Sequence, residues 1–138
     1  MNRLRTSIVL LVLSFVLINV PGIIADSDGT LIVLNKSDNT ASLLDRATGK
    51  QLAEVPTGPS PHEVAVSPNG SLAVVTNYGP RGEPGSTLTF VDLAEARTAR
   101  TIELSHDGQT YHRPHGLRFT PDGKRLVVTA EAEQAIVV

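Results

Sequence analysis

The sequence PHEVAVSPNGSLAVVT at residues 61–76 recurs 53 residues later as PHGLRFTPDGKRLVVT at residues 114–129. A third, partial copy lies upstream, where residues 29–34 align with residues 70–75 at a spacing of 41. Internal similarity at periods of roughly 40 to 50 residues, made of short strands and turns, is typical of folds assembled from repeated sheets. The sequence therefore predicts a chain built from copies of one small β-unit.

Each copy has the pattern of four short strands. In the middle copy we expect strands at residues 63–67, 72–76, 87–92 and about 100–104, because short apolar or alternating runs are separated there by turn residues. Asn69-Gly70 and Asp122-Gly123 follow the first strand of two copies, and such pairs supply the positive φ of tight hairpins. Upstream, residues 41–45 and 51–55 form the corresponding later strands. Helical periodicity is confined to the first two dozen residues, so the fold class is all-β.

Between the sheets we expect apolar side chains to interdigitate. The residues expected to pack there are Val64, Val66, Val74, Leu88, Phe90, Leu117, Phe119 and Val127. Asp45 and Asp92 each close an equivalent third strand, and their carboxylates are expected to accept backbone N–H bonds in the turn that follows.

Residues 29–138 resemble the YVTN-type β-propeller repeat. The resemblance rests on Leu-Ile-Val-Leu-Asn at residues 31–35, Asn-Thr-Ala-Ser-Leu-Leu-Asp at residues 39–45, Pro-His-Glu-Val-Ala-Val-Ser-Pro-Asn-Gly at residues 61–70 and Val-Val-Thr-Asn at residues 74–77. It implies a ring of usually about seven four-stranded antiparallel blades. It also implies kinship in fold with lactonase-like propellers and with some quinoprotein and nitrous oxide reductase propellers. Because one fold hosts unrelated chemistries, the resemblance identifies no activity.

The length of 138 residues does not close such a ring, since about seven blades of about 45 residues need roughly 300. We expect about two and a half blades: a partial blade at residues 29–61, a complete one at 62–113 and a partial one at 114–138. A fragment of a longer protein is therefore the expectation. The alternative is a short protein that completes its ring by oligomerising, because repeat units cannot bury their faces alone.

Residues 1–25 have the three parts of a secretory signal, preceding incomplete repeats at residues 26–138. Arg3 and Arg5 are basic, residues 8–18 are apolar except for Ser14, and Ala25 suits cleavage. An uncleaved signal anchor is the competing interpretation, because residues 8–24 approach the length that spans a bilayer. Either reading predicts export, to the periplasm or the exterior, with membrane contact only through an uncleaved segment.

Composition excludes several classes of function. The chain has no cysteine, which rules out disulfides, cysteine-ligated zinc and thiol catalysis. Without residues 1–25 the chain keeps ten basic and fourteen acidic side chains, a net charge of about −4. This balance gives no indication of nucleic-acid binding.

The candidate site lies on one face of the predicted ring, where the loops at residues 77–86 and 105–113 are long. His62 and His115 hold equivalent positions at the entry of innermost strands, near the mouth of the central channel. Two readings remain open: the pair contributes to a transition-metal site, or each Pro-His is a structural part of the repeat. The other candidate ligand-binding residues around the mouth are Glu63, Tyr78, Arg81, His112 and Arg113.

Arg81 and Arg113 are candidates for holding an anionic ligand, and His112-Arg113-Pro114-His115 is a weak metal-binding pattern on a loop. We find no Gly-rich phosphate loop, nucleophile elbow or catalytic triad spacing. No catalytic residue and no cofactor are therefore predicted, beyond a possible transition metal.

Three functions are compatible with these observations. The favoured one is an exported scaffold that binds a small molecule or a protein through its loop face. The alternatives are a propeller enzyme of the lactonase or quinoprotein sort, and a structural element of the cell envelope or surface layer.

Overall fold

The computed structural model describes residues 29–138, and every regular element in this range is a β-strand. The predicted signal helix lies outside the described residues. The strands are β1 (Thr30–Asn35), β2 (Thr40–Asp45), β3 (Gln51–Pro56), β4 (Pro61–Val66), β5 (Leu72–Asn77), β6 (Thr87–Asp92), β7 (Arg97–Glu103), β8 (Ser105–His106), β9 (Gln109–Thr110), β10 (Pro114–Phe119), β11 (Leu126–Ala130) and β12 (Ala135–Val137). Among residues 29–138, no helix is long and apolar enough to cross a membrane.

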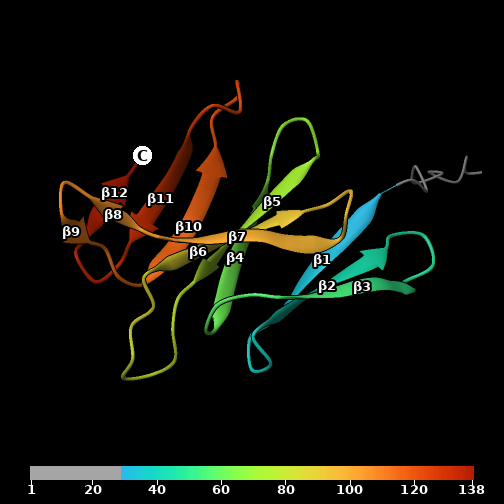
Figure 1. Cartoon of the computed structure of the whole chain (residues 1–138), viewed down its shortest axis with the longest axis horizontal. Helices are drawn as coiled ribbons and strands as arrows, with labels where there is room; N and C mark the ends of the chain where they lie inside the picture. The colour runs from blue at the N-terminus through green and yellow to red at the C-terminus, as the bar shows by residue number, and fades with distance from the viewer. Residues whose placement is uncertain (1–28) are drawn as a thin grey trace, which may run out of the picture.

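The strands form three successive antiparallel sheets and one small hairpin. The first sheet has the order β1-β2-β3, the second β4-β5-β6-β7 and the third β10-β11-β12, while β8 pairs with β9. Figure 1 shows the three sheets side by side, from the blue and green β1–β3 sheet to the orange and red β10–β12 sheet. Strand β4 lies next to both β1 and β10. This arrangement confirms the predicted all-β fold with a four-stranded middle sheet.

The register between copies corrects one expectation. Thr30 pairs with Asp45 in the first sheet as Leu72 pairs with Asp92 in the second, so the two copies correspond at a spacing of 42 residues. The spacing of 41 expected from Gly29 and Gly70 is wrong. Those glycines share a residue type but occupy different positions, because Gly29 lies one residue before Thr30 whereas Gly70 lies two residues before Leu72.

In the two hairpin turns, only the glycine of each predicted pair has a positive φ. Gly70 and Gly123 have φ of 72° and 70°, whereas Asn69 and Asp122 are not among the residues with positive φ. The Gly70 amide donates to the Ser67 carbonyl at 2.8 Å, which closes the turn. Asn69 acts through its side chain, whose Oδ1 accepts hydrogen bonds from the Ser71 amide and from two neighbouring hydroxyls. Glycine alone supplies the left-handed backbone, and the polar residue before it ties the loop together.

The aspartates at the ends of β2 and β6 behave as predicted. Asp45 Oδ1 accepts the Thr48 amide at 2.7 Å, and Asp92 Oδ1 accepts the amides of Ala94 and Glu95 at 3.0 Å each. These three hydrogen bonds cap the turns after the two strands, so the role of both aspartates is structural.

Each face of the second sheet packs on a neighbouring sheet. The core between the second and third sheets contains Val74, Leu88, Phe90, Leu104, Val128 and Ala130. The core between the first and second contains Ala41, Val55, Ala73 and Val91. Because successive strand residues point to opposite faces, Val74 and Ala73 enter different cores.

Two of the residues expected in these cores are not buried there. Val66, at the end of β4, is 46% exposed. Val127 is only half-buried, and its neighbour Val128 is the one that enters the core, at 2% exposure. Val127 is equivalent to Val74, and Val74 lies on the face of the second sheet that packs on the third sheet. No further sheet covers that face of β11 within residues 29–138.

A buried asparagine joins the first sheet to the second. Asn77 is fully buried, its Oδ1 accepts the Gly58 amide at 3.0 Å, and its Nδ2 donates to the hydroxyls of Thr87 and Thr89. A Cβ at Gly58 would lie 2.4 Å from Asn77 Nδ2, so the loop approaches this side chain too closely for any residue but glycine. This contact fixes the chain just before β4 begins.

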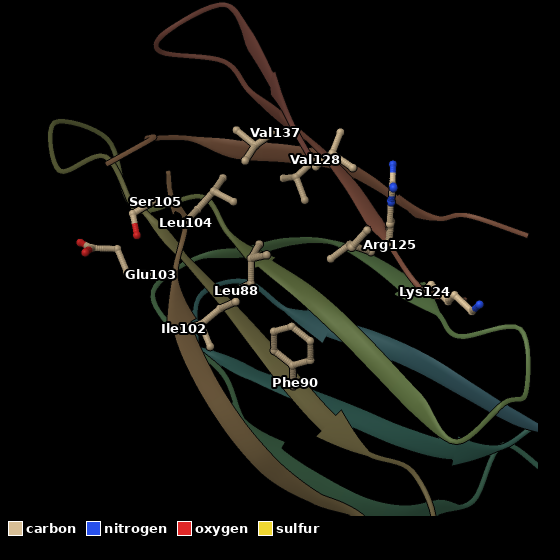
Figure 2. Close-up of a pocket in the computed structure, with 12 residues that line it drawn as sticks. Leu88, Phe90, Ile102, Glu103, Leu104, Ser105, Lys124, Arg125, Val128 and Val137 are labelled. Atoms are coloured by element: carbon tan, nitrogen blue, oxygen red, sulfur yellow. The ribbon is translucent and has the colours of Figure 1, made fainter. Parts of the chain in front are cut away.

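The second and third sheets diverge toward one edge and leave an apolar groove there. Leu88, Phe90 and Ile102 line one side, and Val128 and Val137 line the other (Figure 2). The groove lies between β6–β7 and β11–β12, away from the histidines of the inner strands β4 and β10.

Candidate functional site at the ends of the inner strands

Equivalent bulges hold His62 and His115. The pairing register shifts by one residue between Pro61 and Val64 in β4, and again between Pro114 and Leu117 in β10. A threonine on the neighbouring strand fills each gap: Thr76 Oγ1 accepts the Glu63 amide at 3.0 Å, and Thr129 Oγ1 accepts the Gly116 amide at 2.9 Å. A bulge turns a side chain out of the regular alternation and often marks a site.

The two histidines meet across the boundary between the second and third sheets. Their ring centroids lie 4.3 Å apart with an interplanar angle of 41°. The ring of Tyr78 lies beside both, with centroids 5.1 Å from His62 and 5.7 Å from His115. Ligand atoms of His62, Glu63 and His115 all lie within 4.8 Å of one another. Residues 53 positions apart in the chain therefore form one polar cluster.

The surroundings of His62 favour the neutral form of its imidazole. Burial lowers the pKa of its imidazole, and the neighbouring His115 and Lys36 lower it further, while Glu63 and Glu131 act in the opposite direction. Its Nδ1 atom is buried without a hydrogen-bond partner in the described part of the chain. A neutral imidazole has a free lone pair, so His62 is available as a base or as a metal ligand.

A second series of equivalent positions follows the second strand of each copy. Lys36, Tyr78 and Glu131 come after the corresponding strands β1, β5 and β11. Lys36 Nζ lies 5.6 Å from the centroid of the Tyr78 ring, and the Tyr78 hydroxyl donates to Glu131 Oε2 at 2.8 Å. These three side chains link all three sheets on the side where the histidines lie.

Basic side chains surround Tyr78. Arg113 Cζ lies 4.8 Å from the Tyr78 ring centroid, in a cation–π contact. A cavity of about 510 Å³ opens here, lined by Lys36, Ser37, Ser60, Tyr78, Gly79, Pro80, Arg81 and Arg113. Its lining holds three cationic side chains and no carboxylate.

Arg113 has a strained backbone conformation that recurs at the equivalent residue of the preceding copy. Arg113 and its equivalent Ser60, each preceding a strand-opening proline, have φ of 51° and 48°. Hydrogen bonds hold the Arg113 conformation, because its amide donates to the Gly85 carbonyl at 2.8 Å and its carbonyl accepts the Glu131 amide at 3.1 Å. Such strain in a non-glycine residue persists where the surroundings enforce it, often beside a functional site.

Comparison with known proteins assigns the fold family. A sequence model of the YNCE-like beta-propeller family matches residues 13–138. The chain belongs to this family. Its sheets are therefore propeller blades, and β4 and β10 are the inner strands of adjacent blades.

Solved structures agree with this fold. The chain is similar to a structure described as Kuenenia stuttgartiensis hydrazine synthase, with 22% identity and a TM-score of 0.58 over 78% of this chain and 31% of that chain. It is also similar to a structure described as the dihydro-heme d1 dehydrogenase NirN in complex with DHE, with 19% identity and a TM-score of 0.60 over 79% of this chain and 21% of that chain. The chain thus spans less than a third of either structure. No curated protein sequence matches it.

The propeller brings most of the predicted site residues into two adjoining groups. His62, Glu63 and His115 form the polar cluster, and Tyr78, Arg81 and Arg113 line the cavity. His112 differs, because its Nδ1 lies 2.9 Å from Glu133 Oε1 and its amide donates to Glu133 Oε2. These contacts hold the pKa of the Glu133 carboxyl below its usual range. The His112-x-x-His115 pattern therefore does not bring the two histidines into one ligand cluster within residues 29–138.

Sequence reasoning missed Lys36 and Glu131. The signal that identifies them is their equivalence to Tyr78, which appears once the first two copies are aligned at the structural spacing of 42 residues rather than 41. The equivalent position holds lysine, tyrosine and glutamate in the three copies, so no repeated residue type identifies it in the sequence.

Proposed function

We propose that this propeller is an exported binding scaffold whose loop face holds a small anionic molecule beside Tyr78. The observation that carries the proposal is the cavity of about 510 Å³ lined by Lys36, Arg81 and Arg113 without an acidic side chain. Drug-sized ligands occupy pockets of about 300 to 1,000 Å³, so a metabolite of modest size fits. The chain as a whole is mildly acidic, so the concentration of cations here is local.

Each part of the cavity has a chemical role in this proposal. Arg113 stacks on Tyr78, which orients its planar guanidinium for a carboxylate or phosphate group. Lys36 comes from the first blade and lies over the same ring. Ser37 and Ser60 add hydroxyl groups that donate to ligand oxygens. The Tyr78 ring offers an apolar surface to the ligand's carbon skeleton.

Export and the YVTN-type assignment belong to the same proposal. The basic, apolar and small-residue segments of residues 1–25 support a signal, and the absence of cysteine suits an exported propeller that depends on sheet burial instead of disulfides. A periplasmic or secreted location follows if the signal is cleaved, and membrane attachment follows if residues 8–24 are retained.

A lactonase-like activity is the second candidate. It is favoured by the neutral His62 imidazole next to the Glu63 carboxylate, because a neutral imidazole serves as a general base for water. Assaying a lactone panel with the wild type, His62→Ala and His115→Ala tests it. Hydrolysis that depends on His62 supports the enzyme, and equal rates in a variant remove its histidine from any mechanism.

Anion binding is tested by calorimetric titration of the full chain with citrate and inorganic phosphate. We expect Lys36→Gln and Arg113→Gln each to weaken citrate binding about tenfold, the effect of losing one charge-assisted hydrogen bond. Lys50→Gln, an exposed lysine in the β2–β3 turn, is the matched control and leaves affinity unchanged. The absence of binding to either anion, or equal affinity in all three variants, contradicts the proposal.

A further inference from the structure

We propose that His62, Glu63 and His115 form a binding site for a divalent transition-metal ion, and that Zn²⁺ is the ion this set of ligands fits best. The proposal uses residues other than the cavity cations, so it stands independently of anion binding. It rests on three features of the cluster: the donor types, their separation and their lack of competing partners.

The donors are two imidazoles and one carboxylate. Imidazole nitrogen suits zinc, copper, nickel and iron, whereas magnesium and calcium prefer sites made of oxygen ligands alone. A set of two histidines and one glutamate is a known zinc combination, with a fourth position open for water or a ligand. The chain has no cysteine, so softer thiolate ligands do not compete for the ion.

The separation of the donors is close to what an ion requires. One ligand atom from each residue lies within 4.8 Å of the other two. At the tetrahedral angle, two atoms bound to the same zinc at about 2.1 Å lie about 3.4 Å apart, so an ion draws the longest pair inward by up to about 1.4 Å. Glu63 is exposed on β4, and its side chain has the freedom to make this adjustment.

The donors are not committed elsewhere. His62 Nδ1 is buried without a hydrogen-bond partner, an arrangement that a buried polar atom rarely tolerates without a water or an ion. None of the ion pairs among residues 29–138 uses Glu63. By contrast, His106 and His112 lie next to Asp107 and Glu133 respectively. The two histidines of the cluster are thus the ones whose rings face each other instead of a carboxylate partner.

Side chains of both signs surround the cluster. Lys36 Nζ lies 5.6 Å and Arg113 Cζ 4.8 Å from the centroid of the Tyr78 ring. The Tyr78 hydroxyl donates to Glu131 Oε2 at 2.8 Å, so an acidic side chain also lies beside these cations.

Backbone contacts hold the two histidine strands together before any ion binds. Thr76 Oγ1, on β5, accepts the Glu63 amide and donates to the His115 carbonyl at 3.1 Å. The ligands from adjacent blades are thereby placed by one hydroxyl group, so the site is largely formed in the folded protein.

The test is a calorimetric titration of the chelator-treated full chain with Zn²⁺, in a buffer without citrate because citrate chelates zinc. We expect one ion per chain. His62→Ala, His115→Ala and Glu63→Gln should each weaken binding at least about tenfold, because each removes one of three ligands. His106→Ala is the matched control, since this exposed histidine lies outside the cluster, and it should bind as the wild type does. Circular dichroism confirms that each variant is folded.

Substitution with Co²⁺ supplies a second readout. Direct ligation by His115 predicts visible absorption bands that appear with one equivalent of Co²⁺ and disappear in Glu63→Gln and His115→Ala. The proposal is overturned if the wild type takes up no stoichiometric metal, or if the three cluster variants bind as tightly as His106→Ala. The citrate titration contains no metal, and the Zn²⁺ titration contains no citrate. Failure of the anion-binding proposal and failure of the metal-binding proposal are therefore recognised separately.

Discussion

The hydroxyl of Thr76 donates to the carbonyl oxygen of His115 at 3.1 Å, across the boundary between adjacent blades. Thr76 Oγ1 also accepts the Glu63 amide at 3.0 Å, so one fully buried side chain fills the bulge that carries His62 and connects it to the strand that carries His115. Thr129 fills the equivalent bulge in the third blade but is exposed.

This difference predicts unequal effects of an isosteric substitution. Thr76→Val leaves the Glu63 amide and the His115 carbonyl without their shared partner, and should lower the free energy of unfolding by about 1 to 3 kcal/mol. Thr129→Val, at the exposed equivalent, should cost less than about 1 kcal/mol. Urea denaturation of both variants makes the comparison. Equal losses would mean that the contact between blades contributes nothing.

Asn77 should be among the least replaceable polar residues of the described chain. Asn77→Ala removes three hydrogen bonds made by a fully buried side chain, and the Gly58 amide keeps only the Thr89 hydroxyl as its partner, so we expect a loss of about 2 to 4 kcal/mol in the free energy of unfolding. Asn69→Ala removes hydrogen bonds only within an exposed turn and should cost about 1 kcal/mol or less. Thermal and urea denaturation measure both losses. Equal losses in the two variants would refute the structural role of Asn77.

Neighbouring valines on β11 test which face of the third blade is covered. Val128 is 2% exposed and packs in the core between blades, so Val128→Ala should cost about 2 kcal/mol. Val127 points to the other face and is half-buried, so Val127→Ala should cost less than about 1 kcal/mol. A larger loss at Val127 would show that the register of β11 is shifted by one residue.

Acid should weaken the turn after β2. The amide and hydroxyl of Thr48 donate to Asp45 Oδ1 and hold the pKa of that carboxyl below its ordinary value of 3.8. A group whose pKa is lowered by folding stabilises the protein above its unfolded pKa, and this stabilisation is lost as the pH falls through the folded pKa.

The matching variant is Asp45→Asn. Its melting temperature should lie below that of the wild type at pH 7, and the difference should shrink as the pH falls below about 4. Asp38→Asn, in the preceding turn, is the control and should show no such convergence. A difference that stays constant from pH 7 to pH 2 would rule out the carboxylate as its source.

The fold was predictable because the first hairpin of the repeat occurs twice in closely similar form. Residues 61–76 and 114–129 share the opening Pro-His, a turn with proline and glycine at the same positions, and a second apolar strand, and each of these signals acts over a few residues. The upstream copy is harder to align from the sequence, because matching Gly29 to Gly70 by residue type shifts the alignment by one position. Only the pairing of Thr30 with Asp45 corrects it.

The equivalence of His62 and His115 could be read from the sequence, but the geometry of their contact could not. Equivalence placed His62 and His115 near one channel mouth, yet the 4.3 Å between their rings depends on bulges that no local pattern encodes. The wrong expectation for Val127 has a similar cause: each face of a blade is buried only by its neighbour, so burial in the third blade depends on which neighbour is present.

The meeting of His62 and His115 is the central claim of this account, and nuclear Overhauser effects between their ring protons test it most directly. The chain has four histidines, so selective isotope labelling gives few signals, and His62→Gln and His115→Gln assign them. With ring centroids 4.3 Å apart, we expect cross-peaks between these two imidazoles, and none between His62 and His106. Absence of a cross-peak between His62 and His115 in the folded chain would contradict the proposed arrangement of blades.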